Sequence, residues 1–298
     1  MTGLFALHVG LKQYFDIMKK IAFKKFHCLG NDFIVVDLIG KRSTSIDFND
    51  LTENICNRNI GIGADGVLVL RSSRKCDCFL DIFNSDGSWA EKSGNGLRIT
   101  AAYLALQYKK KSKVKIETEC DSPTAQIIKS GMKQSIIKVS LGEPEFETKK
   151  VPLKSKQKFH INSPIKIDKH DFVITALSVG NPHAVLFVDN FDFDWRFLGN
   201  VIENSKLFPN RTNVEFVKIV SRSKVKLNDW ERGAGATGSS GTGAAAAAVA
   251  GIINGFLNRK VEVVFPGGSL HIEWTEQDKK IFLTGPVEYI CQGEYLLV

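Results

Sequence analysis

Two serines followed by glycine-rich turns are the residues best suited to chemistry. Ser93 stands in Ser-Gly-Asn-Gly and Ser240 in Ser-Gly-Thr-Gly, and each motif runs into an apolar stretch typical of a helix. Glycine lets the backbone turn tightly and approach a ligand. The first N–H groups of a helix lack partners and carry partial positive charge, so such a helix start binds carboxylate or phosphate. Either motif alone is typical of an ordinary helix cap, but two together predict an anion held between two acid–base side chains.

The spacing of these segments indicates an internal duplication. Three pairs of residues keep nearly the same separation: Ser93 and Ser240, with 240 − 93 = 147; Asn84 and Glu231, with 231 − 84 = 147; and Asn31 and Asn181, with 181 − 31 = 150. Two copies are too few for a solenoid. The sequence therefore predicts an α/β (α+β) fold of two pseudo-symmetric domains, each a strand-rich sheet or barrel wrapped around a central helix, with the ligand cleft between them.

Apolar runs bounded by turn residues predict the elements around these helices. The central helices are expected at 97–108 and 244–256, and a further helix at 48–58. Strands are expected at 21–27, 33–37, 67–71, 79–83, 113–118, 125–129, 135–140, 172–177, 184–189, 213–220, 225–228, 261–265, 269–274 and 280–284. The predicted domains are 18–138, completed by 287–298, and 139–286.

Residues 1–17 fit neither copy, and we interpret them as an N-terminal extension with Met18 as the natural start. The intact mass of the native protein tests this interpretation, because a mass that includes Met1 would contradict it.

Composition favours a cytoplasmic protein with no membrane or nucleic-acid partner. The net charge of +8 is spread over many lysines, without a nucleic-acid-binding motif. The longest uncharged run, 233–258, is typical of a glycine-rich loop followed by a buried alanine-rich helix, not of a lipid span. The six cysteines are scattered, as expected for free thiols. Cys76 and Cys78 are too close for a zinc site, and the histidines show no ligand spacing, so no metal is expected.

Seven motifs in order resemble the diaminopimelate epimerases, a family of cofactor-independent amino-acid epimerases. They cover nearly all of residues 18–298 and are FHCLGNDFIVVD, GIGADG, NSDGSWAEKSGNGLR, GNPHAVLFVD, RTNVEFV, ERGAGATGSSGTGA and PGGSL. The resemblance implies two domains around two central helices and a small-molecule substrate, diaminopimelate, bound without pyridoxal phosphate or a metal. A homodimer is also expected, because members of the family often form dimers.

The resemblance also implies roles by position. The distal amino-acid end of the substrate would be bound by Asn31, Asn84, Asn181, Asn213, Glu231 and Arg232. The reacting α-carboxylate would be held at the two helix starts by Gly94, Asn95, Gly241 and Thr242. His183, in Asn-Pro-His, is interpreted as orienting its turn rather than as a general base.

The chain departs from the family at the two catalytic positions, where Ser93 and Ser240 stand in place of cysteines. Inverting an α-carbon needs a base on one face and an acid on the other. A thiol has a reference pKa of about 8.5, which a helix N-terminus lowers, whereas a serine hydroxyl is a far weaker acid. No His or Lys motif beside either serine offers an activating base. Two lesser departures are Ala236, where many members carry Glu, and Gly66, where some place a substrate-contacting Gln.

The sequence thus predicts a scaffold that interconverts LL- and meso-2,6-diaminopimelate by two-base proton transfer in lysine and peptidoglycan-precursor synthesis. The serines predict that this chain is impaired. Whether the replacement is deliberate or natural stays open, and the otherwise complete ligand set favours a change made in an intact enzyme. The alternatives are a phenazine-biosynthesis-like isomerase of the same fold, a non-catalytic amino-acid binding protein, and a basic nucleic-acid module, which predicts steeply salt-dependent binding.

Overall fold

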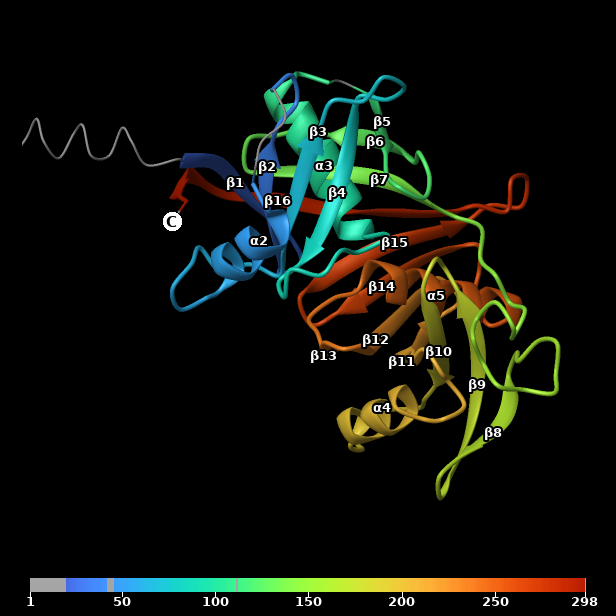
Figure 1. Cartoon of the computed structure of the whole chain (residues 1–298). Helices are drawn as coiled ribbons and strands as arrows, with labels where there is room; N and C mark the ends of the chain where they lie inside the picture. Colours follow the sequence, from blue (N-terminus) through green and yellow to red (C-terminus); the bar gives the residue numbers. More distant parts are fainter. Residues whose placement is uncertain (1–19, 42–45, 111, 298) are drawn as a thin grey trace, which may run out of the picture.

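The structure, a computed structural model, describes residues 20–41, 46–110 and 112–297. The predicted extension 1–17 and the start at Met18 lie outside the described residues. The chain folds into two halves, one built from blue-to-green segments and the other from yellow-to-orange segments, with strand β16 running between them (Figure 1).

The first half is a ring of strands around one helix. Its strands are β1 (Lys20–Cys28), β2 (Asn31–Asp37), β3 (Gly66–Arg71), β4 (Cys78–Asn84), β5 (Lys113–Glu117), β6 (Thr124–Lys129), β7 (Gln134–Gly142) and β16 (Ile281–Leu296). They are hydrogen-bonded in this order, and β16 also pairs with β1, so the ring is closed. Helix α3 (Gly94–Gln107) lies inside it and is buried on nearly every side, as its apolar sequence requires. Helix α2 (Phe48–Cys56) packs against β3 and β4.

The second half repeats this arrangement around helix α5 (Gly241–Ile253). Its strands are β8 (Ser163–Ile167), β9 (His170–Ser178), β10 (Pro182–Phe187), β11 (Asn213–Ser221), β12 (Lys224–Glu231), β13 (Gly235–Ala236), β14 (Lys260–Phe265) and β15 (Gly268–Trp274). The row β16-β15-β14-β12-β11-β10-β9-β8 continues directly from the first ring. The segment after β7 meets β9 through a bridge between Glu145 and Ser178, which brings the strands round α5. The alanines of α5 are fully buried, so the strands pack closely against it.

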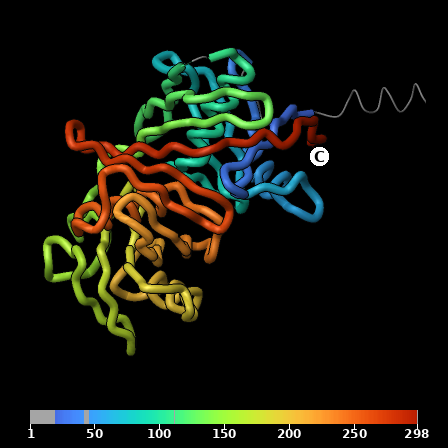
Figure 2. The backbone as a smooth tube through the Cα atoms, turned by 180° about the vertical axis from the view of Figure 1, so that it is seen from behind, coloured from blue at the N-terminus to red at the C-terminus, as the bar shows by residue number. Residues whose placement is uncertain are grey.

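Strand β16 runs from one half to the other, and β7 lies alongside part of it. β16 pairs with β15 at its start and with β1 at its end, and β7 lies beside it over Ile281–Glu288. The view from behind shows β16 running along the junction (Figure 2). Because both strands are continuous here, the division of the chain at 138/139 and 286/287 stays a prediction.

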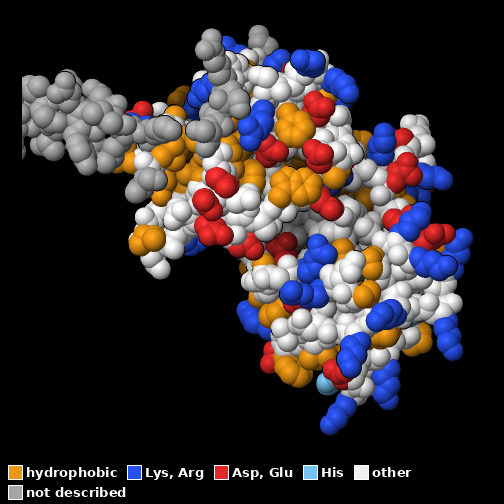
Figure 3. Space-filling model, viewed as in Figure 1, with side chains coloured by type: hydrophobic (Ala, Val, Ile, Leu, Met, Phe, Trp, Pro, Cys, Tyr) orange, Lys and Arg blue, Asp and Glu red, His pale blue; other side chains and the backbone are white. Residues whose placement is uncertain are grey.

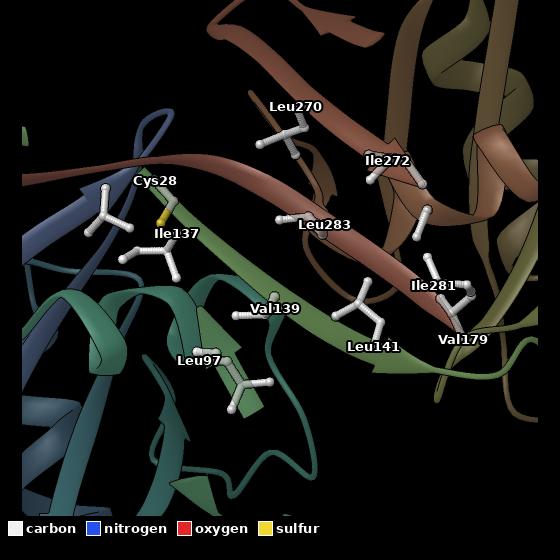
Figure 4. Packing of buried hydrophobic residues seen from close by; sticks show 14 of the residues in the cluster. Cys28, Leu97, Ile137, Val139, Leu141, Val179, Leu270, Ile272, Ile281 and Leu283 are labelled. Atoms are coloured by element: carbon white, nitrogen blue, oxygen red, sulfur yellow. The ribbon is translucent and has the colours of Figure 1, made fainter. Parts of the chain in front are cut away.

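The core at the junction joins the two halves. Leu141 of β7 and Leu283 of β16 lie among the apolar side chains that reach from Leu97 of α3 to Leu270 of β15 (Figure 4). The two leucines lie beneath the starts of both central helices: a Cβ added to Gly94 would lie 3.4 Å from Leu141 Cδ2, and one added to Gly241 would lie 3.1 Å from Leu283 Cδ1. The junction core therefore supports both halves of the site.

The predicted fold class is confirmed, and the observed elements differ from the predicted ones in several places. β16 is far longer than the predicted 280–284, and β8, β13 and helix α4 (Trp195–Glu203) were not predicted. The α4 sequence carries a usable signal, because the Asp194 side chain caps it by accepting from Phe197 N–H at 3.0 Å. α2 ends at Cys56 rather than 58, since Asn57 leaves the helical conformation.

Candidate active site

Ser93 and Ser240 occupy equivalent places at the starts of α3 and α5. The Ser93 hydroxyl accepts a hydrogen bond from Gly96 N–H at 3.0 Å, and the Ser240 hydroxyl accepts from Gly243 N–H at 3.1 Å. Both serines have extended backbone conformations, as N-cap residues require. The two segments are therefore helix starts of the same design.

The two helix starts meet at one cavity. A Cβ added to Gly241 would lie 3.9 Å from Gly94 Cα and 3.5 Å from Asn95 Oδ1, so the first residues of the two helices lie in contact distance of each other. A cavity of about 840 Å³ opens between the halves at this point, visible as a hollow with acidic side chains above it and basic side chains below (Figure 3). Every predicted site residue except Asn213 lines it: Asn31, Asn84, Ser93, Gly94, Asn95, Asn181, Glu231, Arg232, Ser240, Gly241 and Thr242.

The duplication is visible in how each helix start is tied to a strand. In the first half, Asn95 Nδ2 donates to Asn31 Oδ1 at 2.8 Å. In the second half, Asn181 Nδ2 donates to Thr242 Oγ1 at 3.3 Å. Each bond joins the second residue of a central helix to an asparagine where a strand begins, in β2 and just before β10. The equivalent positions thus keep equivalent partners.

A network of charges holds Asn31 in place. Its Nδ2 donates to Asp65 Oδ2 at 2.8 Å, and Arg58 bridges Asp65 and Asp32 at 2.7 and 2.8 Å. Lys25 lies 2.8 Å from Asp32. Burial alone would raise the pKa of Asp32, but the bonds from Arg58 and Lys25 outweigh it and lower that pKa. The network keeps the Asp32 carboxylate ionised, and it fixes the Asn31 amide through the bond from Asn31 Nδ2 to Asp65.

A buried histidine orients Asn181. His183 Nε2 lies 2.8 Å from Asn181 Oδ1, and His183 Nδ1 lies 2.6 Å from Glu215 Oε1. Because Asn181 Oδ1 can only accept, Nε2 carries a proton. His183 is fully buried and both ring nitrogens are occupied, so it acts on Asn181, in agreement with the prediction that it orients its turn.

Two carboxyl groups, of the buried Asp229 and the half-buried Glu231, meet at Thr237, and that of Glu231 also bonds Ser240. The Thr237 hydroxyl is 2.6 Å from both Asp229 Oδ2 and Glu231 Oε1. Burial, together with the charges of Glu231 and Glu215, raises the pKa of Asp229 to about 8. Burial also raises the pKa of Glu231, against hydrogen bonds from Thr237 and Ser240 that lower it. No sequence motif predicts this carboxyl pair, because it forms only where Thr237 contacts both Asp229 and Glu231.

The remaining predicted residues differ in how directly they face the cavity. Asn84 Nδ2 donates to Ser88 Oγ at 3.0 Å. The Arg232 guanidinium is exposed and donates to Asn210 O at 3.2 Å, so it forms no ion pair with Glu231. Asn213 is buried, donating to Pro182 O at 2.8 Å and accepting from Arg232 N–H at 2.9 Å. Asn213 therefore supports the backbone at Arg232, and its contact with substrate stays a prediction.

The structure gives a reason for Gly66 but none for Ala236. Gly66 begins β3 beside β4, where an added Cβ would lie 2.3 Å from Phe83 O. No side chain fits there unless the backbone moves, so this chain has no room for a glutamine at this position. Ala236 lies opposite Trp230 in the short β12–β13 hairpin and lines the cavity.

The described part of the chain contains neither a metal-binding cluster nor a membrane-spanning helix. Within 20–41, 46–110 and 112–297, no group of three or more His, Cys, Asp or Glu side chains is placed to hold a metal ion. No helix of that part of the chain is long and apolar enough to cross a membrane. The arrangement suits the binding of a small anion, because two helix starts can hold one carboxylate, with a hydroxyl beside each start.

Sequence comparisons place this geometry among known enzymes. The sequence model described as diaminopimelate epimerase matches residues 23–147 and 175–290. The diaminopimelate epimerase of Carboxydothermus hydrogenoformans is 43% identical over 278 residues, which cover 92% of this chain and 99% of the relative. That of Methanococcus maripaludis is 37% identical over 274 residues, covering 91% and 98%.

Solved structures share the fold at lower identity. A phenazine biosynthesis protein of the PhzF family from Bacillus anthracis aligns with a TM-score of 0.65 at 17% identity, over 94% of this chain and 100% of its own. A probable proline racemase from Agrobacterium radiobacter aligns with a TM-score of 0.65 at 14% identity, over 93% of each chain. At such identities these likenesses establish the fold alone.

Proposed function

The chain belongs to the diaminopimelate epimerase family, and on that premise we propose that its cavity binds LL- and meso-2,6-diaminopimelate. The observation that carries the proposal is the meeting of two capped helix starts, at Gly94 and Gly241, over one cavity. The α-carboxylate of the reacting centre binds between them, where unpaired N–H groups and two helix dipoles favour an anion. Asn95 and Thr242 complete this binding site.

The side chains at 93 and 240 stand on opposite faces of the bound α-carbon. One removes the α-proton, the electron pair of the broken C–H bond is delocalised into the α-carboxylate, and the other returns a proton from the opposite face. The side chains exchange roles in the reverse direction. This chemistry is supplied by the protein alone, without pyridoxal phosphate or a metal.

The serine hydroxyls impair this chain. A hydroxyl is a much weaker acid than a thiol, and each one already accepts a helix N–H bond. Glu231 lies against Ser240, so one hydroxyl has a carboxyl partner, but burial raises the pKa of that carboxyl and favours its neutral form. We therefore propose that the chain binds diaminopimelate and epimerises it very slowly or not at all.

The distal amino-acid end is bound by the polar groups around the rest of the cavity. Asn31, Asn84 and Asn181 present amides there, and the exposed Arg232 guanidinium suits a carboxylate in a bidentate pair. The Glu231 carboxyl lines the cavity, where its oxygen accepts a hydrogen bond from the distal ammonium group. We place the reaction in lysine and peptidoglycan-precursor synthesis, in a cytoplasmic homodimer, and sedimentation analysis tests the dimer.

Solvent deuterium incorporation at the α-carbon of diaminopimelate, followed by NMR in D₂O, tests the proposal. The chain is run beside a Ser93→Cys/Ser240→Cys variant. Exchange and epimerisation by the variant alone is the expected result. If both the serine chain and the double-cysteine variant bind the substrate but neither exchanges its α-proton, a non-catalytic amino-acid binding protein is favoured instead. An active serine form would contradict the ranking of thiol over hydroxyl.

A further inference from the structure

Arg98 is a buried cation whose charge is unaccounted for. Its side chain is 1% exposed, and it is among the largest fully buried side chains of the described residues. The guanidinium donates to three neutral acceptors: Gly94 O at 3.4 Å, Pro286 O at 3.3 Å and Asn95 Oδ1. No Asp or Glu of the described chain lies within ion-pair distance of it. The one ionisable group that acts on it is the Cys28 thiol, whose pKa burial raises, so that the thiol stays neutral.

The fold makes room for this guanidinium. In β16, a Cβ added to Gly285 would lie 2.2 Å from Arg98 Nη1 and 2.4 Å from Leu270 Cδ2. Glycine in a strand interior weakens the strand and marks a close approach. Gly285 is therefore the residue that leaves space for the Arg98 side chain.

Burial of an unpaired charge is costly, and its position adds to the cost. Arg98 is the fifth residue of α3, and its side chain points back toward the helix start, as helix geometry dictates. A cation at a helix N-terminus is repelled by the helix dipole. Buried charges are ordinarily paired, and a neutral residue of similar volume would often be at least as stable. Helix stability thus gives no reason for a charge here.

We propose that Arg98 is a positioning residue whose buried charge is balanced by the α-carboxylate of the substrate. Arg98 donates to Asn95 Oδ1, and Asn95 lines the cavity beside Gly94 and Gly241. The guanidinium thus fixes the Asn95 amide with its Nδ2 toward Asn31, and it adds a positive potential behind the helix starts. The extra negative charge that the carboxylate gains when the α-proton leaves is stabilised in the same way. This inference rests on the proposed function.

The test compares two ligands that differ at the reacting end. Diaminopimelate carries both amino-acid ends, whereas L-lysine has the distal end but no carboxylate at the other. The serine chain suits the measurement because it binds without rapid turnover. A unit charge about 8 Å away at an effective dielectric constant near 20 changes affinity by roughly 30-fold.

Calorimetric titration of Arg98→Met should therefore show that diaminopimelate affinity falls by at least tenfold. The affinity for L-lysine, measured by NMR, should change by less than about threefold. The melting temperature should stay close to that of the unsubstituted chain. Arg71→Met is the matched control. Arg71 does not line the cavity and forms an ion pair with Asp81 at 2.6 Å, so this variant should leave both affinities unchanged.

If Arg98→Met loses equal affinity for the two ligands, the role of Arg98 is merely structural and the inference is overturned. Unchanged affinity for both ligands would also overturn it. If Arg98→Met does not fold, Arg98→Lys decides: it keeps the charge but loses the planar fork. If Arg98→Lys binds diaminopimelate within about threefold of the affinity of the unsubstituted chain, the charge is responsible for the effect. A tenfold loss of affinity in Arg98→Lys contradicts the inference. Failure of the unsubstituted chain to bind diaminopimelate would instead sink the proposed function.

Discussion

The carboxyl groups of Asp229 and Glu231 share a single hydroxyl, that of Thr237, at 2.6 Å from each. A hydroxyl has one proton, so it can donate to only one of the two oxygens and must accept from the other. One carboxyl of the pair therefore carries a proton. Because Glu231 also bonds Ser240, this proton determines the charge beside one of the two proposed catalytic positions.

The pair predicts that stability falls as the pH rises from about 4 to 8. In the folded chain the pKa of Asp229 is raised from 3.8 to about 8, chiefly by burial. Between these values the folded state holds a proton that the unfolded chain has released. The stabilisation is complete below the unfolded pKa and is lost as the pH rises through the folded one. Asp229→Asn cannot titrate and should show a flatter dependence.

Urea unfolding at pH 5 and pH 8 measures this effect. The free energy of unfolding should fall less between pH 5 and pH 8 in Asp229→Asn than in the unsubstituted chain, by about 1–3 kcal/mol. Each pH unit contributes at most about 1.4 kcal/mol per proton. Glu215, Glu231 and His183 are unchanged in the variant. Asp171→Asn, at an exposed position, is the control and should keep the full drop. An unaltered drop in Asp229→Asn would show that Asp229 is ionised in the folded protein.

Single-thiol variants should separate the two faces of the substrate. Ser93→Cys and Ser240→Cys each place one thiol at one helix start. A lone thiol can remove the α-proton from its own face and return a deuteron there, giving exchange with retention. Each variant should therefore exchange one diastereomer, LL or meso, and the two variants should prefer opposite ones, while inversion stays slow.

NMR in D₂O with stereochemically pure diaminopimelate reads out both exchange and inversion. The double variant is the positive control, because it should exchange and invert both isomers. Exchange of the same diastereomer by both single variants would place the two side chains on one face and contradict the arrangement.

Local patterns predicted much of this site. The SGNG and SGTG motifs predict two helix starts because glycine, serine and apolar residues act over a single turn, and both are found. The 150-residue offset of Asn31 and Asn181 likewise anticipates their matching bonds to Asn95 and Thr242. The helix starts are readable because they depend on neighbours in sequence, and the matching bonds because the sequence repeats itself at a nearly constant offset.

What escaped prediction depends on packing between distant segments. Asp229 precedes Trp230 in a strand, and nothing local marks it as buried against Thr237. Arg98 reads as an ordinary helix residue until β16 closes over it, with Gly285 opposite the guanidinium. The length of β16 follows from pairing with β15, β7 and β1 along one strand, which the sequence of 281–296 does not reveal.

Gly66 should not tolerate a side chain. It lies between β2 and β4, opposite Phe33 and Asn84, and an added Cβ would meet Phe83 O at 2.3 Å and the Phe33 ring at 2.8 Å. Gly66→Ala should lower the free energy of unfolding by about 1–3 kcal/mol, the usual cost of overpacking. Gly94→Ala is the contrast, because its Cβ meets no atom closer than 3.4 Å. Chemical denaturation that finds the two variants equally stable would show that the strands at Gly66 can separate.

Restoring thiols should cost stability. Each serine hydroxyl accepts a helix N–H, at Gly96 and at Gly243, and a thiol is a poorer acceptor. Loss of an N-cap destabilises a protein by about 0.5–2 kcal/mol. Ser93→Cys and Ser240→Cys cap different helices, so their costs should add. The double variant should thus unfold about 1–4 kcal/mol more easily while it gains activity.

Urea unfolding under reducing conditions, with the Ser93→Ala/Ser240→Ala variant alongside, tests this trade-off. The alanine variant should lose about as much stability as the thiol variant and gain no activity, because it removes the caps without supplying an acid or base. A thiol variant as stable as the serine chain would mean that sulfur caps these helices as well as oxygen does. The serines would then give the scaffold no advantage in stability, and their hydroxyls would differ from thiols only in how readily they release a proton.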